Sequence, residues 1–196
     1  MEFCYSMSTQ LKEIQKILEA KANPEAKAAH QKFVPGTKEK IYGVRMPVLN
    51  ELAQQFKAGG FELVEELWNA GALEEKALAV KMLGKIAKKD PERSLRLIQL
   101  FAMNIGNWAI CDAMGMQGLK PILKTHQKEI FALAWKYNSS EDLWQRRLSL
   151  VLVEWYTRVR SLHPEIKKLV KNLENDEEYY VKKAILWINK NFAKGK

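Results

Sequence analysis

The residues best suited by type and spacing to do chemistry are four charged side chains that recur at a nearly constant interval. They are Lys76, Asp112, Arg147 and Lys183, separated by 36, 35 and 36 residues. Equivalent positions of a structural repeat share one face of the protein, so we expect these side chains to line one surface. Asp112 is the one acid in a row of cations. Such a carboxylate could stabilise positive charge that develops on a substrate and could orient an attacking water.

Tryptophans accompany this row at helical spacing. Trp108 lies four residues before Asp112, and Trp187 lies four residues after Lys183. Residues three or four apart are neighbours on a helix, so both rings should lean toward the charged surface. Aromatic rings among cations suit nucleic acid, because the cations neutralise phosphates while the rings lie against sugars or bases. The alternative is that these tryptophans belong to the core.

Asp112 and Arg147 occupy successive equivalent positions and are therefore expected to contact each other. Charge attraction from Arg147 would keep the carboxylate of Asp112 ionised at neutral pH. Two interpretations of this contact stay open. It is either an ion pair that only stabilises the packing of two repeats, or it holds a catalytic carboxylate.

The elements that must position these residues are helices. Apolar residues follow three- and four-residue steps from Ser8 to Lys194, and no segment alternates as a half-buried strand would. Turn signals divide the chain into about ten helices, with a helix start expected at 139–141. Residues 74–80, 143–149 and 179–185 resemble one another, which indicates stacked helix pairs. We predict a single all-α solenoid domain over residues 1–196, with residues 1–8 disordered or beginning the first helix.

Composition narrows the class of partner. The 196 residues carry a net charge of +9, which favours a polyanion such as nucleic acid. Cys4 and Cys111 form no recognisable redox or zinc pair, and no segment resembles a leader or a membrane span, which indicates a cytoplasmic protein. No nucleotide-binding glycine loop or metal-binding motif is present, so we predict neither cofactor nor metal.

Four segments taken together resemble the bacterial AlkD-type DNA alkylation repair glycosylases. They are residues 42–47 (YGVRMP), 107–112 (NWAICD), 143–147 (LWQRR) and 183–188 (KAILWI). The resemblance implies a right-handed solenoid of HEAT-like helix pairs with a concave, basic face, in a nucleoid-associated monomer. Two departures are Asn107, where relatives often have a second aromatic residue, and the end of the sequence soon after Trp187.

The resemblance also implies the function and the roles of individual residues. Cationic alkylated purines such as 3-methyladenine and 7-methylguanine would be excised from double-stranded DNA by hydrolysis of the N-glycosidic bond, without a protein pocket for the base. Asp112, Trp108 and Arg147 would form the catalytic site. The expected DNA contacts are Trp187, Lys76, Lys183, Arg146, Lys182 and Arg45. Two other functions remain open: a non-catalytic binder of distorted or branched DNA, and a protein-interaction scaffold.

Overall fold

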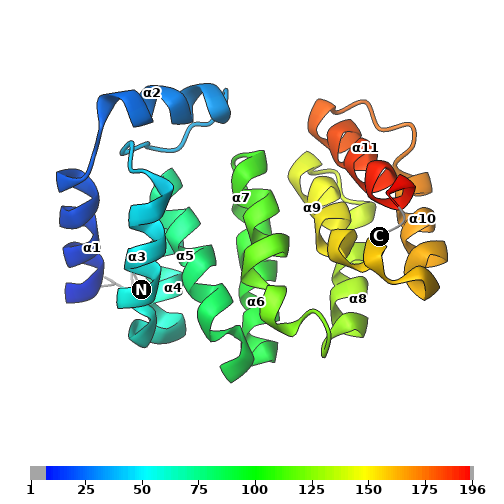
Figure 1. The fold of residues 1–196 in the computed structure, drawn as a ribbon, viewed down its shortest axis with the longest axis horizontal. Helices are drawn as coiled ribbons and strands as arrows, with labels where there is room; N and C mark the ends of the chain where they lie inside the picture. Colours follow the sequence, from blue (N-terminus) through cyan, green and yellow to red (C-terminus); the bar gives the residue numbers. More distant parts are fainter. Residues whose placement is uncertain (1–7, 195–196) are drawn as a thin grey trace, which may run out of the picture. The chain divides into compact units, whose positions relative to one another are not determined.

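The computed structural model describes residues 8–194, which form eleven α-helices and contain no strand (Figure 1). Most connections are short, and the longest are residues 34–45 and 114–126. The all-α prediction is confirmed, with eleven helices in place of about ten. Ser8 caps the first helix, and the rest of the predicted 1–8 segment lies outside the described residues. None of the helices in 8–194 is long and apolar enough to cross a membrane. Contacts divide the chain into two compact units, one ending at Ile86 and the other beginning at Ala87, and each is described by itself.

The first unit holds five helices: α1 (Thr9–Ala20), α2 (Pro24–Phe33), α3 (Met46–Gln55), α4 (Gly60–Ala70) and α5 (Leu73–Ile86). Helices α4 and α5 form a hairpin, with α1 against α4 and α3 against α5. Gly71 makes the tight turn between α4 and α5, because its φ of 88° lies in the left-handed region that favours glycine.

A buried glutamate fixes the segment before α3. The carboxylate of Glu74 accepts hydrogen bonds from the backbone N–H groups of Tyr42, Gly43 and Val44 at 3.0, 2.7 and 3.1 Å. A side chain at Gly43 would place Cβ 2.6 Å from the backbone oxygen of Asn23, so only glycine fits there. Residues 42–44 thus have a structural role that is independent of any ligand.

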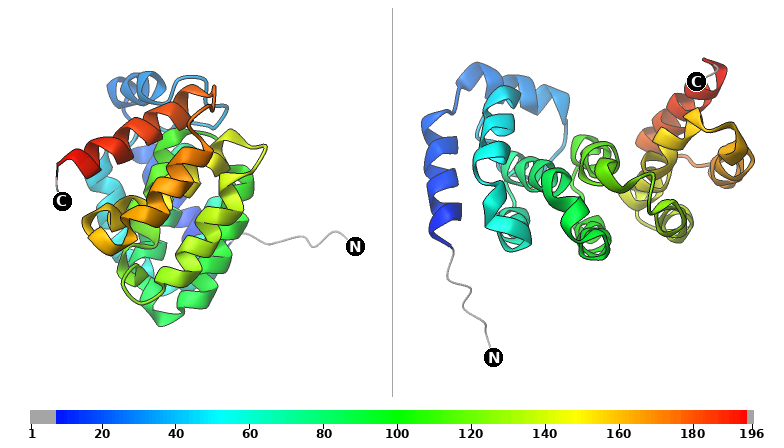
Figure 2. Two further views of the ribbon diagram at one scale, coloured as in Figure 1. Left: turned by 90° about the vertical axis from the view of Figure 1, so that its right-hand side faces the viewer. Right: turned by 60° about the horizontal axis from the view of Figure 1, so that its bottom comes forward.

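The second unit holds six helices: α6 (Pro91–Phe101), α7 (Trp108–Ala113), α8 (Gln127–Asn138), α9 (Leu143–Glu154), α10 (His163–Asn172) and α11 (Tyr179–Ala193). Within this unit α7, α9 and α11 lie side by side in one layer, and α6, α8 and α10 form the other (Figure 2). This is the stacked arrangement of an α-solenoid. Three of the helices that the repeat interval identified as equivalent, α7, α9 and α11, belong to this unit and are neighbours in one layer.

Side-chain caps set the starts of the two helices that matter most for the site. Asn107 Oδ1 accepts a hydrogen bond from Ile110 N at 3.1 Å and begins α7. Asp142 Oδ1 accepts one from Gln145 N at 2.9 Å and begins α9. The predicted start at 139–141 is therefore slightly early, because Ser140 Oγ instead accepts a hydrogen bond from the backbone N–H of Asp142.

A close helix contact sets the distance between α7 and α9. Helix α7 continues into a π-helical turn, Met114–Gly118, which packs against α9. A Cβ atom built on Gly115 would lie 2.8 Å from Cγ1 and 3.0 Å from the backbone oxygen of Val151. The missing side chain lets the two backbones approach closely three residues after Asp112.

Gly115→Ala is expected to lower the melting temperature. At an open helical position this substitution would be neutral or stabilising by up to about 1 kcal/mol, because alanine favours helix. Here the added methyl group meets the backbone of α9, which cannot move aside cheaply. Calorimetry or thermal circular dichroism measures the effect. A melting temperature equal to or above that of the wild type would contradict the close approach.

Candidate active site

The centre of the candidate site is a two-pronged ion pair between α7 and α9. Arg147 Nε and Nη2 donate hydrogen bonds to Asp112 Oδ1 and Oδ2, each at 2.9 Å. Arg147 Nη1 donates to the backbone carbonyl oxygen of Tyr180 at the start of α11. All three equivalent helices of the unit therefore meet at one guanidinium. The predicted contact between Asp112 and Arg147 is present.

This pair is largely removed from water but not sealed. The side chain of Arg147 is 7% exposed and that of Asp112 is 17% exposed. Burial raises the pKa of the Asp112 carboxyl above its ordinary value, and the hydrogen bonds and charge of Arg147 oppose the rise without cancelling it. The sequence-based expectation was that pairing with Arg147 would offset desolvation and keep Asp112 ionised at neutral pH, and the structure adds that burial has the larger effect on the pKa. Desolvation penalises the charged form of a buried carboxyl.

Two half-buried tryptophans lie on the same layer of helices. Trp108 is the first residue of α7, one turn before Asp112. Trp187 lies on α11 between two contacts to α9: the Tyr180 carbonyl that binds Arg147, and Asn191 Nδ2, which donates to Glu154 Oε1 at 2.7 Å. Residues 180, 187 and 191 share one helix face, so Trp187 lies on the side of α11 that faces α9.

A third half-buried tryptophan, Trp144, lies on α9. Its ring centroid lies 5.0 Å from that of Tyr180, so it packs α9 against α11. This contact gives Trp144 a packing role, although its side chain is as half-buried as those of Trp108 and Trp187.

Two of the expected DNA-binding cations are engaged inside the protein. Lys76 Nζ lies 2.7 Å from Glu39 Oε1 in a buried pair of the first unit. Arg146 Nε lies 2.6 Å from Asp176 Oδ2, and its Nη1 donates to the carbonyl oxygens of Ser140 and Glu141. A phosphate would have to displace these partners, so the expected DNA contacts of Lys76 and Arg146 stay predictions that require the two ion pairs to open. The guanidinium of Arg147 is likewise engaged, by the Asp112 carboxylate and the Tyr180 carbonyl oxygen.

The remaining expected cations are exposed. Lys182 and Lys183 lie on the outer side of α11, where Lys183 Nζ sits 5.3 Å from the centroid of the Tyr179 ring. Arg45 begins α3 in the first unit, and its guanidinium lies 3.9 Å from a carboxylate oxygen of Glu25. Exposed cations that are weakly held within the protein can pair with phosphates.

Sequence reasoning missed Tyr180 and the pair formed by Glu154 and Asn191. The role of Tyr180 belongs to its backbone carbonyl, which no residue type signals. Glu154 and Asn191 are 37 residues apart, close to the interval that separates Asp112 from Arg147. A search for polar pairs at the repeat interval would have found them.

No group of three or more His, Cys, Asp or Glu side chains that could hold a metal ion occurs within residues 8–194. Cys111 is buried beside Asp112, and its Sγ lies 3.5 Å from the carbonyl oxygen of Trp144. This thiol packs between α7 and α9. The chemistry that the site offers is electrostatic: a desolvated carboxylate, held in a fixed orientation, with part of its surface open.

Arg147→Met is expected to lower the free energy of unfolding by about 3 to 5 kcal/mol, because it leaves the Asp112 carboxylate buried without its partner. Chemical denaturation measures the change. The control is Arg160→Met, which removes an exposed arginine and should change stability by less than about 0.5 kcal/mol. Adding Asp112→Asn to Arg147→Met should restore part of the loss. Equal stability of the two single arginine variants would contradict the ion pair.

Comparisons with known proteins agree with this architecture. The fold is similar to the solved structure of a "Predicted DNA alkylation repair enzyme from Enterococcus faecalis", with a TM-score of 0.76 and 17% identity over 89% of this chain and 84% of that chain. No curated protein matches the sequence. The family model described as "DNA alkylation repair enzyme" matches residues 14–196. The chain therefore belongs to the DNA alkylation repair enzyme family, as the four sequence segments indicated.

Proposed function

We propose that this protein is a DNA glycosylase that removes cationic alkylated purines from double-stranded DNA, acting as a monomer. The observation that carries the proposal is the carboxylate of Asp112, which is desolvated, oriented by two hydrogen bonds from Arg147 and still partly exposed. Membership of a DNA alkylation repair family supports DNA as the partner. The substrates 3-methyladenine and 7-methylguanine carry a positive charge on the base.

The charge on the base simplifies the reaction. The alkylated purine leaves as a neutral molecule when the N-glycosidic bond breaks, so the enzyme need not protonate it. Positive charge then develops on the deoxyribose, and water must attack its C1′ atom. Asp112 would stabilise that charge electrostatically and accept a hydrogen bond from the attacking water, which loses one proton to solvent as the C1′–O bond forms.

The other residues of the site would hold the substrate in place. Arg147 is a positioning residue, because all its observed bonds go to Asp112 and to the Tyr180 carbonyl. Trp108 and Trp187 would pack against the sugar and backbone at the lesion. Lys182, Lys183 and Arg45 would pair with phosphates, and their contribution to affinity should weaken as salt rises.

Asp112→Asn is expected to lower the rate of base release about a hundredfold or more, because it removes a preorganised charge from the reacting centre. Release of 7-methylguanine from methylated duplex under single-turnover conditions measures the rate. Asp142→Asn is the matched control, since Asp142 is an exposed helix cap of the same unit and should leave the rate unchanged.

Three outcomes of this assay separate the functions that the sequence left open. Release that depends on Asp112 supports the glycosylase. Binding of duplex DNA without any release of methylated base indicates a non-catalytic DNA binder. Absence of DNA binding at physiological salt indicates a protein-interaction scaffold.

The pH dependence of base release provides a second test. The ionised form of Asp112 is the active one, so activity is complete above its pKa and is lost as pH falls through it. Burial raises this pKa, so the acid limb of the rate profile should lie above the ordinary aspartate value of about 4. Arg147→Met removes the interactions that lower the pKa and should shift the limb to still higher pH. Rates are corrected for spontaneous depurination, and a limb at or below pH 4 would contradict the assignment.

A further inference from the structure

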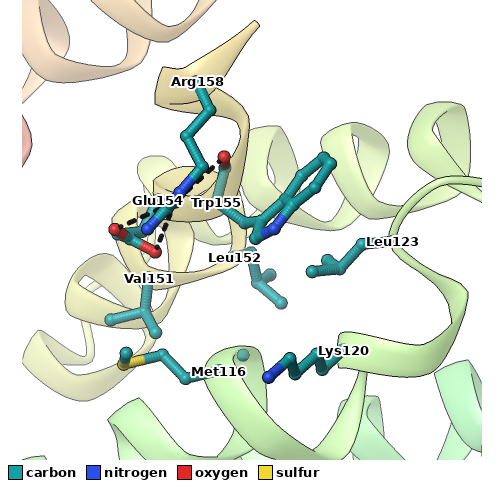
Figure 3. A pocket seen from close by; sticks show the side chains of 9 residues that line it. Met116, Lys120, Leu123, Val151, Leu152, Glu154, Trp155 and Arg158 are labelled. Carbon is teal, nitrogen blue, oxygen red and sulfur yellow. Dashed lines mark hydrogen bonds and ion pairs between the residues drawn. The ribbon is translucent and has the colours of Figure 1, made fainter. Parts of the chain in front are cut away.

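A cavity of about 130 Å³ lies between α9 and the segment that follows α7, within the second unit (Figure 3). Its residues come from the same helix faces as the candidate site. On α9, Val151 and Glu154 lie one and two turns beyond Arg147, and Met116 lies one turn beyond Asp112. At a rise of about 1.5 Å per residue, Glu154 is roughly 10 Å from Arg147 along the helix. The cavity is therefore a continuation of the surface that holds Asp112.

The cavity combines apolar walls with cations at its two ends. Arg158 and Lys120 lie across it from each other, and Trp155 and Leu123 line the side between them (Figure 3). Lys120 is exposed, and Arg158 is 44% exposed. A third cation stands close by, because Lys124 Nζ lies 6.0 Å from the centroid of the Trp155 ring. These groups suit a ligand that has a flat or apolar central part and a negative charge at each end.

Glu154 also lines the cavity, but its carboxylate is already engaged. It is buried and accepts the short hydrogen bond from Asn191, while Arg158 Nη1 lies 3.4 Å from both of its oxygens. Arg158 Nη1 also donates to the carbonyl oxygen of Trp155 at 3.1 Å. These contacts use one nitrogen of the guanidinium and aim Arg158 along the edge of the cavity. Its Nε and Nη2 groups can then donate to a ligand.

We propose that this cavity is a subsite for a nucleotide that flanks the lesion in the bound DNA strand. The phosphates on the two sides of that nucleotide pair with Arg158 and Lys120, and its sugar and base edge lie against Trp155. A nucleotide within a strand has this arrangement, because its sugar and aromatic base lie between two negatively charged phosphates. The inference rests on the proposed function only in taking DNA as the ligand.

Removing the charge of one DNA phosphate at a time provides the test. Duplexes are prepared in which one phosphate at a time is replaced by an uncharged methylphosphonate, and the Kd of each is measured with wild-type protein. The same series is measured with Lys120→Ala, Arg158→Ala and Lys171→Ala. Lys171 is an exposed lysine of α10, in the other helix layer, and serves as the matched control.

We expect Lys120→Ala and Arg158→Ala each to reduce the slope of log Kd against log salt by about 1, as for the loss of one phosphate contact. Each variant should also become insensitive to one methylphosphonate position that weakens wild-type binding, and the two positions should flank one nucleotide. Trp155→Leu should weaken binding about fivefold or more without changing the salt slope. Lys171→Ala should behave as wild type. Melting temperatures confirm that each variant is folded.

The outcomes distinguish the subsite from the glycosylase. Wild-type protein that shows this phosphate pattern but releases no methylated base would retain the subsite and overturn the proposed activity. Protein that releases base while Lys120→Ala and Arg158→Ala match Lys171→Ala would retain the activity and overturn the subsite. Absence of duplex binding by wild-type protein would overturn both.

Discussion

The ion pair between Asp112 and Arg147 is the interaction on which the second unit depends. One guanidinium binds the carboxylate of α7 through two nitrogens and a carbonyl of α11 through the third. Removing two charges from water is costly, and only the paired, fully hydrogen-bonded geometry offsets that cost. The three helices must therefore keep their spacing, which Gly115 permits by letting α7 approach α9 closely.

The same contact gives the carboxylate its chemical character. In a partly desolvated site a charge interacts more strongly with a developing positive charge than it would in water. Arg147 fixes the orientation of both oxygens, so little reorganisation is needed during a reaction. The pKa of Asp112 is raised because burial destabilises its charged form. A positive charge placed beside Asp112 would stabilise that charged form again. An interaction that stabilises the fold can thus prepare the carboxylate for catalysis.

Polar pairs at the repeat interval are a general feature of this chain. Glu39 binds Lys76 in the first unit, while Glu154 binds Asn191 in the second. Each pair joins neighbouring segments of the repeat, and most of them serve packing. Asp112 differs because 17% of its side chain stays exposed, on a layer of helices that also carries the half-buried Trp108 and Trp187. The exposed fraction of the side chain, rather than repeat position, therefore distinguishes Asp112 from the carboxylates of the other pairs.

The sequence by itself determined the all-α class, the repeat interval and the meeting of Asp112 with Arg147, because helical periodicity and equivalent positions are local, regular signals. Only the tertiary structure showed which of the expected DNA-binding cations are already paired with carboxylates. Lys76 and Arg146 are cations at or next to repeat positions, as Lys183 is, yet each is paired with a carboxylate, 37 and 30 residues away in the sequence. The sequence also could not predict the hydrogen bond from Arg147 to the Tyr180 carbonyl or the net rise in the pKa of Asp112. Both depend on which atoms surround a side chain once water is excluded, and that arrangement exists only after the helices pack.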